Sequence, residues 1–185
     1  MHESESATLA DAREGSSDAY RAAVDSNSRR LFRLAFRITG NEQDAEDVVQ
    51  ETLLRAFKQL SRFESRASFA TWLYRIAANC SLDLVREKKR RQETAAVRTE
   101  QTEKTSDPAP DRLVYSSQVQ YRVTEAMNQL SQQERAAFVL RHFEGQSIEQ
   151  ISEALGLSLN AAKHSIFRAV QKLRRELEPV VGTVL

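Results

Sequence analysis

Apolar residues along this chain recur every three or four positions, which is the spacing of one face of an α-helix. Leu31, Leu34 and Ile38 follow this spacing, and Gly40 is typical of the residue that ends a helix. Asn41 has the side chain of an N-cap and predicts the start of the next helix. Alternating apolar and polar positions are rare, and the chain has only 5 Gly and 3 Pro. The pattern predicts an all-helical protein.

The first half of the chain contains two further apolar stripes of helical period. The stripe that follows Asn41 comprises Ala45, Val48, Val49, Thr52, Leu53, Ala56, Phe57 and Leu60. After the polar stretch 61–68, a third helix is predicted to turn inward Phe69, Trp72, Leu73, Ile76, Ala77, Cys80 and Leu84. Trp72 shares this stripe with Phe69, which favours core packing over a role as a stacking platform for bases. Cys80 is interpreted as a small buried hydrophobe.

Residues 90–112 differ from their surroundings because they are polar and nearly free of large apolar side chains. Such a segment buries too little surface to offset its ordering entropy, so we expect a flexible linker between two small helical domains. The expected organisation is a flexible tail at 1–15, a first domain at 16–91, the linker at 92–115, a second domain at 116–178 and a tail at 179–185.

The second half begins with a helix marked by Val119, Val123, Met127 and Leu130. Capping boxes, in which a Ser and a Glu or Gln three residues later satisfy each other's backbone N–H, predict two more helix starts. They are Ser131 with Glu134 and Ser147 with Gln150.

Residues 147–177 have the pattern of a helix-turn-helix. A short helix is followed by Gly156, which adopts a left-handed conformation at little cost, and Ser158 caps a longer helix. Rotation by 100° per residue places outward Asn160, Ala161, His164, Arg168, Gln171 and Arg175, with Lys163 and Phe167 on the flank. Asn, Gln and Arg can pair with base edges, and Lys and Arg with phosphates, so this helix is predicted to bind DNA.

Charge is segregated along the chain although the formal net charge is only +1. Five carboxylates and no Lys or Arg lie in 41–54, whereas 86–91 is strongly basic. Segregation of this kind indicates different partners for different faces. A single Cys fits a reducing compartment, the start of the chain is unlike a signal peptide, and no long apolar window is present. We therefore expect a cytoplasmic protein without membrane insertion.

With these motifs in view, the chain resembles the small two-domain bacterial sigma factors of the extracytoplasmic-function (ECF) type, in the sigma-70 superfamily. DAEDVVQETLLRAF (44–57) is similar to the family's polymerase-binding helix. SFATWLYRIAANCSLDLVR (68–86) is similar to its promoter-melting and minus-ten segment, and residues 130–174 to its minus-thirty-five-binding domain. The resemblance implies a monomer that joins core RNA polymerase, directs it to promoter DNA and is held inactive by an anti-sigma factor.

The resemblance implies that the acidic helix meets protein, namely the clamp helices of the largest polymerase subunit. Residues at three- and four-residue spacing on this helix are expected to share the face opposite its buried stripe. They are Asp44, Asp47, Gln50, Glu51 and Arg55. An ordinary solvated helix face is the alternative for this charge run.

For the minus-ten element, the resemblance implies base capture by the loop from Arg62 to Ser68 and by the outer face of the following helix. The expected residues are Arg62, Ser65, Ser68, Arg75, Asn79, Asp83, Arg86, Lys88 and Lys89. For the minus-thirty-five element they are Asn160, Lys163, His164, Phe167, Arg168 and Gln171. Many relatives carry further arginines near Ser165 and Val170, and their absence here implies fewer phosphate contacts. Two interpretations of His164 have equal weight: a donor to a base or phosphate, or an exposed histidine without a role. An additional C-terminal domain found in some subfamilies is not expected.

Two other classes of protein fit this sequence less well. An operator-binding repressor needs a dimer interface, for which the sequence offers no spare hydrophobic face, and it leaves the first domain without a role. An enzyme is disfavoured because the three His are scattered and no Cys pair, HExxH or Gly-rich phosphate loop is present. We expect no catalytic residues, no metal site and no cofactor.

Overall fold

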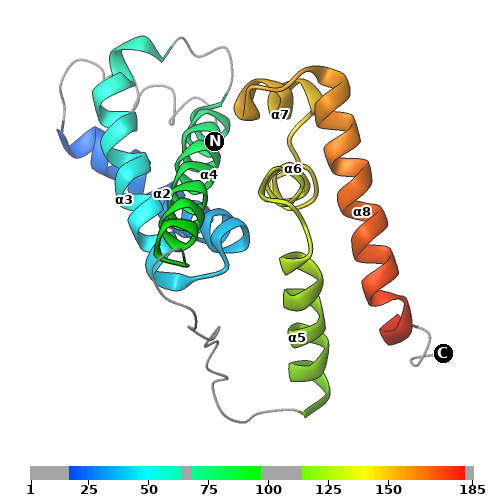
Figure 1. Cartoon of the computed structure of the whole chain (residues 1–185). Helices are drawn as coiled ribbons and strands as arrows, with labels where there is room; N and C mark the ends of the chain where they lie inside the picture. The colour runs from blue at the N-terminus through cyan, green and yellow to red at the C-terminus, as the bar shows by residue number, and fades with distance from the viewer. Residues whose placement is uncertain (1–16, 64–67, 97–113, 182–185) are drawn as a thin grey trace.

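A computed structural model of the chain describes residues 17–63, 68–96 and 114–181, and these are helical, as predicted (Figure 1). In chain order the elements are α2 (Ser17–Thr39), α3 (Glu42–Gln59), the short 3₁₀ helix η1 (Leu60–Arg62), α4 (Phe69–Ala96), α5 (Val114–Asn128), α6 (Gln132–His142), α7 (Ile148–Leu155) and α8 (Leu159–Val181). Helix α4 extends beyond residue 91, where the sequence suggested that the first domain ends. The expected tail at 1–15 and most of the expected linker lie outside the described residues.

Helices α2, α3 and α4 pack against one another and form the first half of the molecule. Gly40 ends α2 with φ 75°, and the Asn41 side chain accepts a hydrogen bond of 3.0 Å from the Asp44 backbone N–H, so both predicted signals at this corner are confirmed. The predicted inner stripe of α3 is correct for Val48, which is fully buried. It is wrong for Phe57, which is 60% exposed because its ring packs at the outer edge against Tyr20, with centroids 5.2 Å apart.

Helices α5 to α8 form the second half, and its helix starts follow the sequence signals. Ser131 and Ser147 each form a complete capping box, with Glu134 and Gln150. Gly156 ends α7 in the left-handed region, at φ 63°. The hydroxyl of Ser158 then accepts a hydrogen bond of 3.2 Å from the Ala161 backbone N–H at the start of α8. The predicted helix-turn-helix is therefore formed by α7 and α8.

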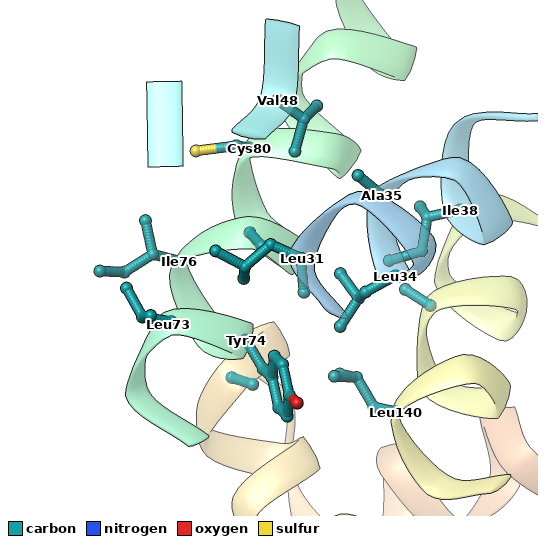
Figure 2. Close-up of a cluster of buried hydrophobic side chains, with 14 of the residues drawn as sticks. Leu31, Leu34, Ala35, Ile38, Val48, Leu73, Tyr74, Ile76, Cys80 and Leu140 are labelled. Carbon is teal, nitrogen blue, oxygen red and sulfur yellow. The ribbon is translucent and has the colours of Figure 1, made fainter. Parts of the chain in front are cut away.

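The two halves share one hydrophobic core. Leu34 and Ile38 of α2 and Tyr74 of α4 cluster with Leu140 of α6 (Figure 2). Each of these side chains is at most 4% exposed. Figure 1 shows α6 and α7 lying beside α2 and α4. The arrangement of the halves is therefore set by side-chain packing as well as by the chain that joins them.

Candidate nucleic-acid and protein interfaces

The acidic face of α3 is narrower than the sequence predicted. Asp47, Gln50 and Glu51 are exposed, and Arg55 forms a 2.6 Å ion pair with Glu51. Asp44 is only 6% exposed, so its placement on this outer face was wrong. The reason is that α4 is long enough to run past the start of α3, where Lys88 forms an ion pair with the Asp44 carboxylate.

A groove lies beside this acidic face and was not predicted from the sequence. It has a volume of about 580 Å³ and lies between α2 and α3. Its lining residues are Ser28, Arg29, Phe32, Arg33, Glu46, Val49 and Gln50. The rings of Phe32 and Phe36 stack nearby with centroids 6.3 Å apart, and Phe36 is 42% exposed. The sequence feature that could have indicated this groove is the pair of aromatic residues on α2, Phe32 and Phe36, but helical spacing alone assigns such a pair to the core. The face thus combines negative charge with an apolar groove.

The outer face of α4 carries the residues expected to contact the minus-ten element. Arg75, Asp83 and Arg86 are exposed and Asn79 is half-buried. Several of these groups are already engaged, because Arg75 pairs with Glu153 of α7, and Asp83 lies 3.7 Å from Arg86 and 3.8 Å from Arg55.

Further along α4, Lys89 lies on the exposed surface, 3.8 Å from Glu93. Lys88 was expected at DNA and is held by Asp44, although about half of its side chain remains exposed. The basic face therefore continues along α4 to Lys89, but Lys88 is bound to the neighbouring helix.

The loop before α4 is only partly described. Arg62 ends η1, its side chain is not described, and Ser65 lies outside the described residues. The Ser68 hydroxyl accepts a 3.1 Å hydrogen bond from the Thr71 backbone N–H at the start of α4.

The described residues at the two ends of this loop belong to an aromatic cluster. The ring centroids of Phe63 and Phe69 lie 5.1 Å and 5.6 Å from that of Trp72. This packing confirms the interpretation of Trp72 as a core residue. Cys80 is buried as expected, and burial raises the pKa of its thiol.

The outer face of α8 matches the sequence prediction well. All six residues expected at the minus-thirty-five element, Asn160, Lys163, His164, Phe167, Arg168 and Gln171, are exposed. Phe167 is 60% exposed, and Leu159, which the sequence analysis did not single out, is 46% exposed. Ser165 is only 4% exposed, so an arginine at this position would not lie on the outer face.

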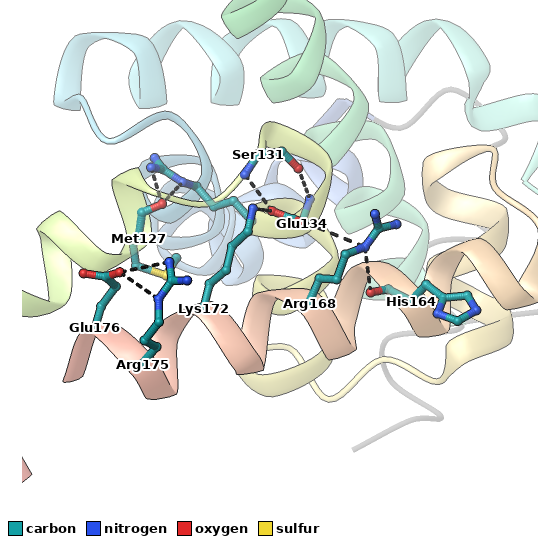
Figure 3. A network of polar contacts seen from close by, with 9 residues as sticks. Met127, Ser131, Glu134, His164, Arg168, Lys172, Arg175 and Glu176 are labelled. Carbon is teal, nitrogen blue, oxygen red and sulfur yellow. Dashed lines mark hydrogen bonds and ion pairs between the residues drawn. The ribbon is translucent and has the colours of Figure 1, made fainter. Parts of the chain in front are cut away.

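A buried carboxylate of α6 lies close to two cationic side chains of α8, Arg168 and Lys172 (Figure 3). Glu134 of α6 is 7% exposed and accepts hydrogen bonds from Lys172 at 2.7 Å and from the Ser131 backbone N–H at 2.9 Å. The Nε of Arg168 lies 4.0 Å away. Burial would raise the pKa of Glu134, but the hydrogen bonds from Lys172 and Ser131 outweigh it, so the pKa is lowered and the carboxylate stays charged. The capping role of Glu134 was predicted from the sequence, but its hydrogen bond with Lys172 of α8 was not.

Other kinds of site find little support in residues 17–63, 68–96 and 114–181. They contain no cluster of three or more His, Cys, Asp or Glu placed to hold a metal ion. None of the helices described is both long and apolar enough to cross a membrane.

Both halves of the chain match models of one protein class. Residues 23–91 match sigma-70 region 2, and residues 120–173 match sigma-70 region 4. The ECF RNA polymerase sigma factor SigW of Bacillus subtilis is 30% identical over 172 residues, covering 89% of this chain and 92% of the relative. SigE of Mycolicibacterium smegmatis is 35% identical over 151 residues, covering 82% of this chain but 58% of the relative's length. The chain belongs to the ECF family of sigma-70 factors.

Two solved structures have a similar fold. The sigma factor RpoE of Bartonella quintana, in complex with the anti-sigma factor NepR, aligns with a TM-score of 0.67 at 22% identity, covering 86% of this chain and 96% of RpoE. CnrH, in complex with the cytosolic domain of CnrY, aligns with a TM-score of 0.66 at 26% identity, covering 93% of this chain and 96% of CnrH. The chain therefore shares its overall fold with RpoE and CnrH.

Proposed function

We propose that this protein joins core RNA polymerase and directs it to a specific set of promoters. The observation that carries the proposal is the match of both halves to sigma-70 regions 2 and 4, together with 92% coverage of the B. subtilis ECF relative. A repressor or an enzyme would leave one of the two matched regions unexplained. The experiment is run-off transcription with core polymerase on genomic fragments, in which discrete start sites must depend on added protein.

Docking on polymerase is assigned to α3 and the groove beside it. Asp47 and Glu51 present negative charge to the clamp helices of the largest subunit, which offer a basic surface in the family. Opposite potentials speed encounter and fix register, while affinity comes mainly from packed apolar anchors. The α2–α3 groove, with Phe32 and Val49 in its lining, supplies such anchors. Asp44 is left out of this surface because it is buried.

Capture of the melted minus-ten strand is assigned to the loop before α4 and to the outer face of α4. Unstacking a base costs a few kcal/mol, which binding in a pocket and along a basic groove must offset. Arg75, Arg86 and Lys89 supply exposed positive charge along about four turns of this helix. Arg62, Ser65 and Ser68 are proposed to form the base pocket, and Asn79, Asp83 and Lys88 to complete the surface.

Reading of the minus-thirty-five duplex is assigned to α8 in the major groove. Asn160, Arg168 and Gln171 can pair with base edges, and Phe167 can contact a thymine methyl group. Lys163 and His164 lie beside them and can reach phosphate oxygens. The exposed position of all six side chains in the structure supports this assignment.

Regulation by an anti-sigma protein is proposed on the same surfaces. The aligned RpoE and CnrH structures are complexes with anti-sigma NepR and with the cytosolic domain of CnrY. The sigma factor is proposed to be a monomer, with the segment between α4 and α5 following the polymerase near its RNA path. Co-purification from cells tests for the anti-sigma partner, and a free, constitutively active pool contradicts it.

A further inference from the structure

Two cationic side chains of α8 lie against one carboxylate of α6. The Nζ of Lys172 is 2.7 Å from the Glu134 carboxylate, and the Nε of Arg168 is 4.0 Å from it. Apolar packing sets this alignment, because Ala169 and Leu173, the residues that follow the two cations, are buried in the cluster that α8 forms with α5 and α6. The carboxylate therefore has a fixed place behind the face of α8 that is assigned to DNA.

The two oxygens of the Glu134 carboxylate have different partners. Oε2 accepts hydrogen bonds from the Ser131 backbone N–H at 2.9 Å and from the Lys172 Nζ at 2.7 Å. Oε1 faces the Nε of Arg168. The Glu134 backbone N–H also donates to the Ser131 hydroxyl at 3.2 Å, which completes the capping box. The cap and Lys172 therefore fix the Glu134 side chain, and with it the oxygen that lies nearest to Arg168.

The guanidinium of Arg168 is held through its Nε. This nitrogen faces Glu134 and donates to the His164 carbonyl at 3.4 Å (Figure 3). The Arg168 side chain is nevertheless 64% exposed, so its terminal groups Nη1 and Nη2 can reach a ligand outside α8. A planar guanidinium can donate two parallel hydrogen bonds to O6 and N7 of a guanine. The arrangement restrains Arg168 from behind and leaves it the donors that a guanine needs.

Restraining an arginine before it binds DNA should affect sequence discrimination more than total affinity. An unrestrained arginine loses rotamer freedom on binding, and it can turn to a phosphate or another base when the preferred base is missing. A restrained arginine loses less freedom at the correct base and makes such substitute contacts less easily. The carboxylate also adds negative charge near the phosphates, which disfavours every DNA sequence alike. Its benefit is therefore expected in discrimination.

We propose that Glu134 is a positioning residue for Arg168 in promoter reading. The carboxylate orients the guanidinium so that Nη1 and Nη2 of Arg168 distinguish one guanine of the minus-thirty-five element from the other bases. Lys172 and the cap at Ser131 keep the carboxylate in place. The inference rests on the proposed function, because it requires that α8 reads the minus-thirty-five duplex.

The test is a double-mutant cycle in the full chain assembled with core polymerase. The variants are Glu134→Gln, Arg168→Ala and the two together. Glutamine removes the charge and keeps an oxygen for the capping box, as Gln150 does for Ser147 in this chain. Binding of the holoenzyme is measured on a mapped promoter and on fragments in which each minus-thirty-five base pair is replaced in turn. Discrimination is the ratio of the affinities for the original and the replaced base pair.

The cycle should show that the two residues act as a unit. Arg168→Ala should remove a discrimination of roughly five- to 150-fold at one G·C pair. Glu134→Gln should lower discrimination at that pair by about three- to tenfold and leave it unchanged at the other pairs. In the Arg168→Ala background, Glu134→Gln should change it by less than about twofold, because the side chain that it positions is gone.

Two controls separate positioning from folding and from net charge. Ser131→Ala weakens the cap but keeps the backbone N–H that binds Glu134, so it should lower stability and leave discrimination unchanged. Glu125→Gln removes an exposed carboxylate from α5 and should affect all fragments alike. Thermal denaturation of each variant shows that binding is measured on folded protein.

A second measurement observes Arg168 in the absence of DNA and polymerase. Its Nε–H signal, identified by its loss in Arg168→Ala, should show restricted motion in ¹⁵N NMR relaxation of the full chain. In Glu134→Gln the signal should shift and become as mobile as that of an exposed arginine. In Ser131→Ala it should remain restricted.

Unchanged discrimination in Glu134→Gln overturns the proposal, and so does an equal loss with and without the Arg168 side chain. A gain in affinity for all fragments, with no change in their ratios, shows a bulk charge effect and also contradicts positioning. If Arg168→Ala keeps full discrimination at every base pair, Arg168 reads no base and Glu134 has nothing to position. If unmodified protein fails to initiate at discrete start sites, the proposed function itself is refuted, and the NMR signal reports the restraint of Arg168 separately.

Discussion

Reversing the two charges of the α3 face, by Asp47→Lys with Glu51→Lys, separates the role of this face in binding from its role in folding. Both side chains are exposed. Asp47 accepts one weak hydrogen bond, from Gln43 at 3.4 Å, and Glu51 pairs with Arg55 at 2.6 Å. An exposed i, i+4 pair contributes about 0.3–0.5 kcal/mol, and a like-charge pair costs a similar amount. The expected loss of folding stability is therefore about 1 kcal/mol.

The expected effect on polymerase binding is much larger. Each substitution places a positive charge against the basic clamp surface, and like-charge juxtaposition across an interface costs several kcal/mol. A loss of about 3 kcal/mol corresponds to a more than ~100-fold weaker complex. The assay is fluorescence anisotropy of labelled protein titrated with core polymerase, with thermal denaturation of the same samples as the measure of folding.

A charge-matched control is available in Asp25→Lys with Glu125→Lys, because both residues are exposed on helices outside the α3 face. This control should bind polymerase within about threefold of the unmodified protein at the ionic strength used. If the α3 variant binds as tightly as the control while remaining folded, the assignment of α3 to polymerase docking is refuted.

Three further predictions follow from the structure. Phe167→Ala should weaken binding of a mapped minus-thirty-five duplex by about 1–2 kcal/mol. The salt dependence of binding should change little, since a thymine methyl contact releases no counterions. An unchanged affinity in a filter-binding titration counts against this contact. Glu134→Gln should destabilise the protein at neutral pH and much less in acid. The reason is that the pKa of Glu134 is lowered in the folded state, so the charged carboxylate stabilises the fold above the ordinary carboxylate pKa, and this stability is lost as the pH falls through the folded-state pKa. Urea unfolding at several pH values measures the difference in stability, and a pH-independent difference contradicts the prediction. The Cys80 thiol, buried and with a raised pKa, should react with a thiol reagent at pH 8 only after denaturant is added, and rapid labelling of the native protein would show that the site opens.

Local features of this fold were predictable from the sequence, because they depend on residues that are close in the chain. Each capping box, at Ser131 and at Ser147, joins residues three positions apart, and the turn at Gly156 follows from the residue itself. The exposed face of α8 follows from the spacing of residues within one helix. Helical rotation assigns such faces correctly when one side of the helix is buried and the other is free.

Features set by distant partners were not predictable in this way. The burial of Asp44 depends on Lys88, 44 residues later, and on how far α4 extends beyond the start of α3. The ion pair between Arg75 and Glu153 spans 78 residues and the segment expected to be a flexible linker. A helical period shows that a residue lies on a given face but does not show which other helix covers that face.

The pairing of Lys88 with the buried carboxylate of Asp44 links the start of α3 to the C-terminal half of α4. The helix proposed to bind the polymerase is therefore joined to the helix proposed to bind the opened strand by this ion pair as well as by apolar packing. If the proposed roles of the two helices hold, a displacement of α4 on binding DNA is carried to α3 through this ion pair and through the side chains packed between the two helices.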